Sequence, residues 1–136
     1  MLPSVTVFVF DKQMRVLLAR HRNNNVWVAP GGMVEPDEIP MESAIREMQE
    51  ETGCGIRIIK MLGTFGGPEF RLQYENGDEV GYVMTAYEAE IIDGKPAADG
   101  EEILELRYFS FDETKLLATA DWLPTVLKEI YETRLL

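Results

Sequence analysis

The sequence predicts an α/β fold in which a mixed β-sheet lies between helices. Runs rich in β-branched and aromatic residues, which are typical of strands, outnumber helical patterns along the 136 residues. Two segments repeat apolar residues with the spacing of a helix face, one after the third strand run and one near the end of the chain. Each helix must bury its apolar face against another layer, so the simplest packing places the two helices on opposite faces of the sheet.

The first part of the chain is predicted to form three strands, at residues 4–10, 14–20 and 26–32. A polar turn at 11–13 predicts a hairpin between the first two strands. The polar loop before the third strand carries His21, the only histidine. We expect this side chain to be exposed and to have no catalytic role.

A helix is predicted to begin at Pro40 and to end before Gly53. Proline suits the first helical position, where a backbone N–H has no partner, and glycine suits the left-handed position after the last turn. Apolar residues recur along one face, which we expect to be the buried one: Met41, Ala44, Ile45 and Met48.

The rest of the chain returns to strand patterns, at residues 56–66, 70–75, 79–92 and 105–111. Asn76-Gly77 predicts that the second and third of these runs pair as a hairpin. Asp112 and Asp121 are expected to cap a short helix at 113–118 and a last helix. The last helix carries an apolar stripe: Leu123, Val126, Leu127, Ile130 and Tyr131.

Length and composition indicate one domain, residues 1–136, with 46% apolar residues. No apolar run is long enough to cross a bilayer, and the N-terminus lacks the basic start of a signal peptide. The single cysteine, Cys54, excludes an internal disulfide. We therefore expect a cytoplasmic monomer or homodimer that does not associate with membranes.

The net charge of −11, from 13 basic and 24 acidic residues, limits the class of partner. Such a surface repels nucleic acid and anionic lipid, so it argues against long DNA or RNA. A small polyphosphate remains compatible with this charge if metal ions screen the site. The alternative is that the charge serves solubility alone.

Three carboxylates share one face of the predicted helix, because Glu47, Glu50 and Glu51 lie at positions i, i+3 and i+4. Like charges at these spacings destabilise a helix by a few tenths of a kcal/mol per pair, and a bound divalent cation reverses that effect. Carboxylate oxygens are the ligands that Mg²⁺ takes. The alternative for the glutamates alone is a solvated acidic face.

The wider segment favours the metal. Glu38 follows Gly32 after five residues, and Arg46-Glu-Met-Gln-Glu-Glu-Thr-Gly-Cys54 follows after seven more. This resembles the Nudix box, whose pattern is G-x5-E-x7-R-E-apolar-x-E-E-x-G-apolar, and every fixed position is met. Cys54 fills the last apolar position, which more often holds an aliphatic residue. The chain resembles MutT/Nudix hydrolases, and this resemblance implies a Nudix-type α/β/α sandwich.

The resemblance also implies a reaction and roles for the box residues. Family members use Mg²⁺, or Mn²⁺ in its place, and water to cleave the diphosphate link of a nucleoside diphosphate derivative. Glu50 and Glu51 would bind metal, with Glu47 as a third ligand or the general base. Glu38 would support the metal or its water, and Arg46 would orient the glutamates. No serine, cysteine or histidine nucleophile is needed for this chemistry.

Two further metal contacts are implied from outside the helix. Gly31 or Gly32 would offer a backbone carbonyl, because glycine lets the backbone approach closely. An additional carboxylate is expected from Glu102, six residues before Tyr108, with Glu101 as the second choice. The alternative is that both acidic residues only cap a polar loop.

The resemblance implies a small nucleotide as substrate, but the sequence does not choose among nucleoside triphosphates, ADP-ribose-like compounds and sugar nucleotides. Arg20 and Arg22 are candidates for holding phosphate, or else surface charges. Three aromatic residues are candidates for stacking on a base: Phe70, Tyr74 and Tyr82. Cross-strand packing is their commoner use.

A second class of function is a catalytically idle Nudix domain that binds or senses a nucleotide. A sensor would tolerate a broken box and would usually carry an output domain. The complete box and the expected single domain favour the enzyme.

Overall fold

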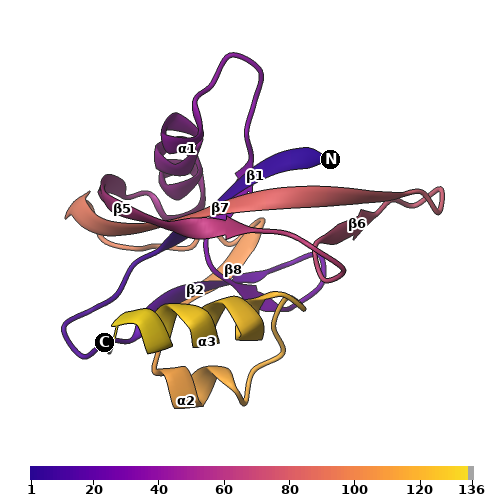
Figure 1. The fold of residues 1–136 in the computed structure, drawn as a ribbon. Helices are drawn as coiled ribbons and strands as arrows, with labels where there is room; N and C mark the ends of the chain where they lie inside the picture. Colours follow the sequence, from indigo (N-terminus) through magenta and orange to yellow (C-terminus); the bar gives the residue numbers. More distant parts are fainter. Residues whose placement is uncertain (135–136) are drawn as a thin grey trace.

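The computed structural model describes residues 1–134 (Figure 1). The strands are β1 (Leu2–Phe8), β2 (Val16–His21), β3 (Trp27–Val28), β4 (Gly31–Met33), β5 (Gly55–Phe65), β6 (Arg71–Gln73), β7 (Glu79–Asp93) and β8 (Ile103–Phe109). The helices are α1 (Pro40–Thr52), α2 (Phe111–Thr114) and α3 (Leu123–Arg134). Within these residues no helix combines the length and the apolar character needed to cross a membrane.

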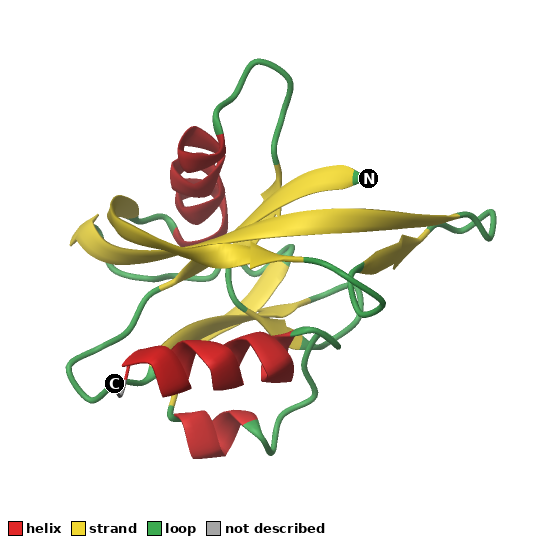
Figure 2. Cartoon of the chain, viewed as in Figure 1, coloured by secondary structure: helices red, strands yellow, loops and turns green. Residues whose placement is uncertain are grey.

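The strands form two sheets between helical layers. The larger sheet has the order β4-β1-β7-β5, with β6 also paired to β7, and the smaller sheet has the order β3-β2-β8. β1 runs parallel to β7, and the other strand pairs are antiparallel, so the larger sheet is mixed. Helix α1 lies on one side of the sheets, and α2 and α3 lie on the other (Figures 1 and 2). The α/β class is confirmed, but with two sheets rather than the single expected sheet.

Two sequence predictions are met only in part where the sheets separate. The expected hairpin of residues 4–10 and 14–20 is confirmed near its turn, where Phe10 pairs with Val16 and Leu17 N donates to Val9 O at 2.9 Å, but β1 and β2 then join different sheets. The single strand expected at 26–32 is divided into β3 and β4 around Pro30. Proline lacks a backbone donor and is poorly tolerated inside a strand. The segment therefore changes sheets at this point.

The predicted Asn-Gly hairpin is confirmed. β6 and β7 pair in register from Arg71 opposite Gly81 to Gln73 opposite Glu79. Gly77 has φ +91°, which a glycine adopts without strain. In Figure 1 this hairpin projects from one end of the larger sheet.

The two faces of the larger sheet bury separate apolar clusters. Ala44 and Met48 of α1 pack with Val5 and Val7 of β1 and Tyr87 of β7. On the other side, Phe8 and Met84 pack with the expected stripe of α3, all of which is buried: Leu123, Val126, Leu127, Ile130 and Tyr131. Helix α1 is thus packed against β1 and β7, and this packing fixes the position of the carboxylates that α1 carries.

Helix α1 begins and ends as predicted. Pro40 is its first residue, and Gly53 follows its last turn with φ +75° and donates its N–H to Gln49 O at 3.0 Å. The predicted buried face is partly wrong, because Met41 and Ile45 are 44% and 42% exposed. Buried polar residues take their place: Ser43, Glu51 and Thr52. The helix is therefore rotated so that Glu51, and with it Glu47, turns toward the sheet, whereas Glu50 stays exposed.

The predicted caps of the last two helices are also wrong. Ser110 caps α2, accepting from Glu113 N at 3.1 Å, while the Glu113 carboxylate accepts from Ser110 N at 2.8 Å. Asp112 therefore lies inside α2, which covers 111–114 rather than 113–118. Helix α3 begins at Leu123, so Asp121 stands one position too early to be its N-cap. A serine and a glutamate three residues apart make the better capping box at α2.

Candidate active site

Two carboxylates of α1, those of Glu47 and Glu51, face the glycine strand β4. A Cβ atom on Gly32 would lie 2.4 Å from Oε1 of Glu47, and a Cβ atom on Gly31 would lie 2.2 Å from the backbone oxygen of Val5. Both distances are far below van der Waals contact. Glycine at these positions therefore lets strand β4 approach β1 on one side and the Glu47 carboxylate on the other.

Arg46 joins most of the box carboxylates. Its Nε and Nη2 donate to the two oxygens of Glu38 at 2.7 and 3.0 Å, and Nη1 donates to Glu47 Oε1 at 2.9 Å. Nη1 also lies 3.3 Å from Glu50 Oε2, and Nη2 donates to Met33 O at 3.1 Å. The contact of Arg46 with Glu50, four residues later on α1, is thus longer than its contacts with Glu38 and Glu47.

These contacts shift the ionisation of both partners. The hydrogen bonds from Arg46 and, next in size of effect, the hydrogen bond from the Ser43 hydroxyl at 2.6 Å lower the pKa of Glu38 to about 2. Glu38, followed by Glu47 and Glu50, raises the pKa of Arg46 above its ordinary value. Glu38 and Arg46 therefore both stay charged at neutral pH, and their ion pair holds the N-terminal half of α1 to the loop before it.

Glu51 has the opposite environment. The residue is 8% exposed, and burial, followed by a hydrogen bond and charge repulsion from Glu47, raises the pKa of Glu51 to about 9. Its Oε2 accepts from Gly31 N at 3.4 Å, whereas its Oε1 is buried without a hydrogen-bond partner. A buried carboxyl group in this setting is either protonated or opposite a cation.

His21 belongs to the same site, which the sequence did not indicate. Its side chain is 28% exposed, and its buried Nε2 lies 3.8 Å from Glu51 Oε1. Burial lowers the pKa of His21, and the charge of Glu102 opposes that shift. The expectation of an exposed loop histidine is wrong, because His21 is the last residue of β2 and its side chain lies beside Glu51 of α1.

The segment before β8 lies beside this histidine. Arg22 donates to the backbone oxygens of Glu101 and Gly100, and its own N–H donates to Glu102 O at 2.9 Å. One cavity is lined by these residues: His21, Arg22, Asn23, Glu101 and Glu102. The structure therefore brings the two candidate acidic residues near the α1 carboxylates, and the negative charge of Glu102 contributes to the raised pKa of Glu51.

The two arginines predicted to hold phosphate are already engaged. Arg20 pairs with Glu105 at 2.9 Å and donates to Asn25, and its guanidinium lies 5.9 Å from the centre of the Trp27 ring. Arg22 is bound to the loop oxygens described above but still lines the cavity beside Glu102. Of the two, Arg22 is the better placed to meet a ligand.

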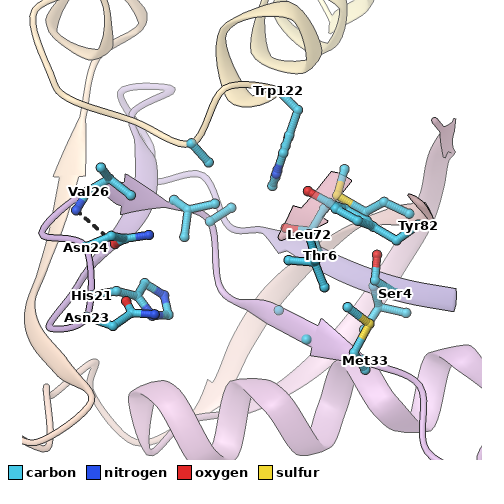
Figure 3. Close-up of a pocket in the computed structure, with 17 residues that line it drawn as sticks. Ser4, Thr6, His21, Asn23, Asn24, Val26, Met33, Leu72, Tyr82 and Trp122 are labelled. Carbon is cyan, nitrogen blue, oxygen red and sulfur yellow. Dashed lines mark hydrogen bonds between the residues drawn. The ribbon is translucent and has the colours of Figure 1, made fainter. Parts of the chain in front are cut away.

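A second cavity, of about 270 Å³, lies on the other side of the glycine strand. It has no Asp, Glu, Lys or Arg in its wall, and the polar side chains that line it include Ser4, Thr6, His21, Asn23, Asn24, Tyr82 and Trp122. Figure 3 shows His21, Asn23 and Asn24 at one side, Tyr82 and Ser4 at the other, and Trp122 above them. Gly31 and Gly32 form part of the wall, so this neutral cavity borders the carboxylates.

The three predicted aromatic residues have different positions. Tyr82 lines the neutral cavity. Phe70 is buried, with its ring edge-on to Tyr82 at 5.5 Å and stacked with Trp122 at 5.8 Å, so this ring has no free face for a base. Tyr74 is 48% exposed near the hairpin turn. Trp122 was missed, since a tryptophan beside an apolar helix pattern resembles core.

The donor set fits a metal ion only after side chains move. Among residues 1–134, no three acidic, histidine or cysteine side chains are arranged closely enough to hold an ion. However, Glu47 contributes to the raised pKa of Glu51, and Glu51 has a buried oxygen without a hydrogen-bond partner. A divalent cation beside Glu51 would be opposite in charge to that carboxylate, and Glu47 and Glu50, which now both contact Arg46, would be its further ligands.

Comparison with known proteins agrees with this arrangement. A family model described as NUDIX domain matches residues 1–130. A putative 8-oxo-dGTP diphosphatase of Bacillus subtilis is 31% identical over 104 residues, which are 76% of this chain and 63% of the relative. An ADP-ribose pyrophosphatase of Methanocaldococcus jannaschii is 29% identical over 121 residues, which are 85% and 67% of the two chains. The chain thus spans less than two thirds of the first of these relatives.

Solved structures share the fold. A UDP-X diphosphatase superposes with a TM-score of 0.82 at 22% identity, covering 96% of this chain and 61% of the other. The NUDIX domain of Shewanella oneidensis NrtR, complexed with ADP ribose, superposes with a TM-score of 0.75 at 20% identity, covering 100% and 89%. At these identities the likeness concerns the fold alone.

Proposed function

Because the chain belongs to the NUDIX domain family, we propose that it is a Mg²⁺-dependent pyrophosphohydrolase acting on nucleoside diphosphate derivatives. One observation carries the proposal: the buried Glu51 carboxyl accepts from Gly31 N at 3.4 Å and lies 3.8 Å from Nε2 of His21, which lines both the neutral cavity and the cavity beside Glu101 and Glu102. Arg46 pairs with Glu47 but not with Glu51, and a buried carboxylate that faces no cation is costly for a fold unless it is protonated or binds one.

The proposed metal ligands are Glu47, Glu50 and Glu51, with the Gly31 carbonyl and Glu102 as further donors. Mg²⁺, or Mn²⁺ in its place, would neutralise phosphate charge and lower the pKa of a bound water. The role of Arg46 is to hold Glu38 and Glu47 in fixed orientations through the bonds described above. One of the box glutamates would accept the proton of the attacking water.

The neutral cavity is the proposed site for the nucleoside part of the substrate. Tyr82 and Trp122 offer aromatic surface, and Asn23 and Asn24 offer amide donors and acceptors. A base in this cavity would direct its phosphates past Gly31 toward the carboxylates. The names of the relatives support this class of substrate, since they include an 8-oxo-dGTP diphosphatase and an ADP-ribose pyrophosphatase.

A panel of nucleotides tests the proposal. Nucleoside triphosphates, oxidised triphosphates, ADP-ribose and sugar nucleotides are each incubated with the protein and Mg²⁺, and the products are identified by chromatography. We expect a nucleoside monophosphate from at least one of them, and Glu51→Gln should abolish its release. Glu42→Gln is the matched control, because Glu42 lies on the same helix and only accepts from Ile39 N, which glutamine also does. Turnover that survives Glu51→Gln would refute the assignment.

Binding without turnover is the second candidate function. It is favoured by the similarity to the NrtR domain, whose structure contains ADP ribose. Calorimetric titration with ADP-ribose, together with the product assay, separates the two. Tight binding with no hydrolysis in the presence of Mg²⁺ or Mn²⁺ would establish the sensor.

A further inference from the structure

Two buried polar atoms face one another beside the site. Among the described side chains, His21 Nε2 and Glu51 Oε1 are the buried nitrogen and oxygen atoms without a hydrogen-bond partner, and they lie 3.8 Å apart. An unpaired buried donor or acceptor destabilises a fold, because the group loses its hydrogen bonds to water and gains none in return. A pair that closed by about 1 Å would reach ordinary hydrogen-bond distance and satisfy both atoms.

We infer that His21 is a positioning residue, whose neutral imidazole donates its Nε2–H to Glu51 Oε1 and fixes the direction of that carboxylate toward the metal. The inference rests on the proposed function, in which Glu51 is a metal ligand. The opposite oxygen, Oε2, already accepts from Gly31 N at 3.4 Å. In the inferred arrangement each oxygen of the Glu51 carboxylate accepts one hydrogen bond from the protein, and each keeps a second lone pair for the metal.

The backbone around His21 fixes the direction of its side chain. The β2–β8 ladder shifts register between Arg20 and His21, and such bulges commonly redirect a side chain beside an active site. His21 N donates to Val26 O at 3.0 Å, and His21 O accepts from Asn25 N at 2.8 Å. The imidazole therefore projects from a backbone fixed on both sides. Hydrogen bonds of this kind to a metal ligand are known to affect metal affinity about 10–100-fold.

The test measures metal binding without substrate. Mn²⁺ is titrated into the protein and the free ion is followed by electron paramagnetic resonance. In His21→Asn the amide reaches only the Nδ1 position, whereas in His21→Gln it reaches the Nε2 position. We expect His21→Asn to weaken Mn²⁺ binding on the order of tenfold and His21→Gln to restore most of it. Thermal unfolding of each variant without metal shows that the fold is retained.

Because the chain has one histidine, the ring nitrogens also give an unambiguous nuclear magnetic resonance signal. With Mg²⁺ bound and the imidazole neutral, we expect the proton on Nε2. A bare Nε2, equal Mn²⁺ affinity in wild type and His21→Asn, or equal loss in both variants would overturn the inference. So would a variant that raised only the KM for nucleotide at saturating Mg²⁺, which would place His21 on the substrate.

The controls separate this inference from the proposed function. If the wild type bound no Mn²⁺, the proposed metal site and the role of His21 would both be wrong. If the wild type bound Mn²⁺ and Glu51→Gln did not, while both His21 variants bound it normally, only the role of His21 would be wrong.

Discussion

Arg46 grips Glu38 with two parallel hydrogen bonds, from Nε to Oε2 at 2.7 Å and from Nη2 to Oε1 at 3.0 Å. The same guanidinium reaches Glu47 at 2.9 Å with its remaining nitrogen. One side chain therefore ties the loop before α1 to a proposed metal ligand on α1. Only a planar fork of donors makes all of these contacts at once, and a lysine ammonium does not.

Arg46→Lys tests this arrangement. The charge is kept and the fork is lost, so we expect turnover with the best substrate to fall about 10–100-fold. Arg57→Lys is the matched control, because Arg57 pairs with Glu90 on an exposed part of the sheet, where such pairs contribute little. Steady-state kinetics at saturating Mg²⁺ compares the two. Similar rates in both variants would show that the fork has no role beyond its charge.

Replacing each glycine of β4 separates function from stability. In Gly32→Ala the new methyl group meets the end of a flexible side chain, Glu47, which has to move away. We expect turnover to fall at least about tenfold while the free energy of unfolding changes by no more than about 1 kcal/mol. In Gly31→Ala the methyl group meets the backbone oxygen of Val5, which does not yield easily. That variant should be destabilised by about 2 kcal/mol or more.

Urea unfolding and Mn²⁺ titration of both glycine variants check these outcomes. Metal binding should weaken in Gly32→Ala although its fold is intact. Equal destabilisation of the two variants would contradict the different contacts of the two positions.

The raised pKa of Glu51 predicts how the stability of the metal-free protein depends on pH. With a pKa of about 9 in the folded state and an ordinary value when unfolded, the folded protein binds more protons between these two pKa values. The stabilising effect of that proton is complete below about pH 4.5 and is lost as the pH rises toward 9. The free energy of unfolding contributed by this group therefore falls with rising pH.

Glu51→Gln removes that dependence, because the amide stays neutral. At pH 8 without metal we expect the variant to be more stable than the wild type by about 2 kcal/mol, less than the full linkage because water entry and relaxation reduce the shift. Added Mg²⁺ should stabilise the wild type and not the variant. Denaturant titrations at several pH values measure this, and parallel curves for the two proteins would refute it.

Much of the site could be predicted from the sequence, because it is local. Pro40, Gly53 and the glutamate spacing lie within one helix, so helical geometry alone places the carboxylates on one face. The rotation of α1 could not be predicted in the same way, since Met41 and Ile45 are as apolar as the buried Met48. The sheet decides which arc of the helix is covered.

The remaining residues of the site come from distant parts of the chain. His21 reaches Glu51 through a bulge at the end of β2, and Trp122 reaches Tyr82 through the turn before α3. Neither approach leaves a periodic pattern in the sequence. The division into two sheets, which depends on Pro30 and on the partners each strand finds, is likewise a property of tertiary packing.

Tyr82 and Tyr74, which the sequence did not distinguish, should now behave differently. Tyr82 lines the neutral cavity, while Tyr74 is exposed near the hairpin turn. Stacking of a base on an aromatic side chain contributes about 1–3 kcal/mol, so Tyr82→Leu should raise the KM for the nucleotide on the order of tenfold. The affinity for Mn²⁺ without substrate should be unchanged, since Tyr82 does not contact the carboxylates. Tyr74→Leu is the matched control and should leave KM, turnover and Mn²⁺ affinity as in the wild type, and an equal rise of KM in both variants would exclude the neutral cavity as the nucleoside site.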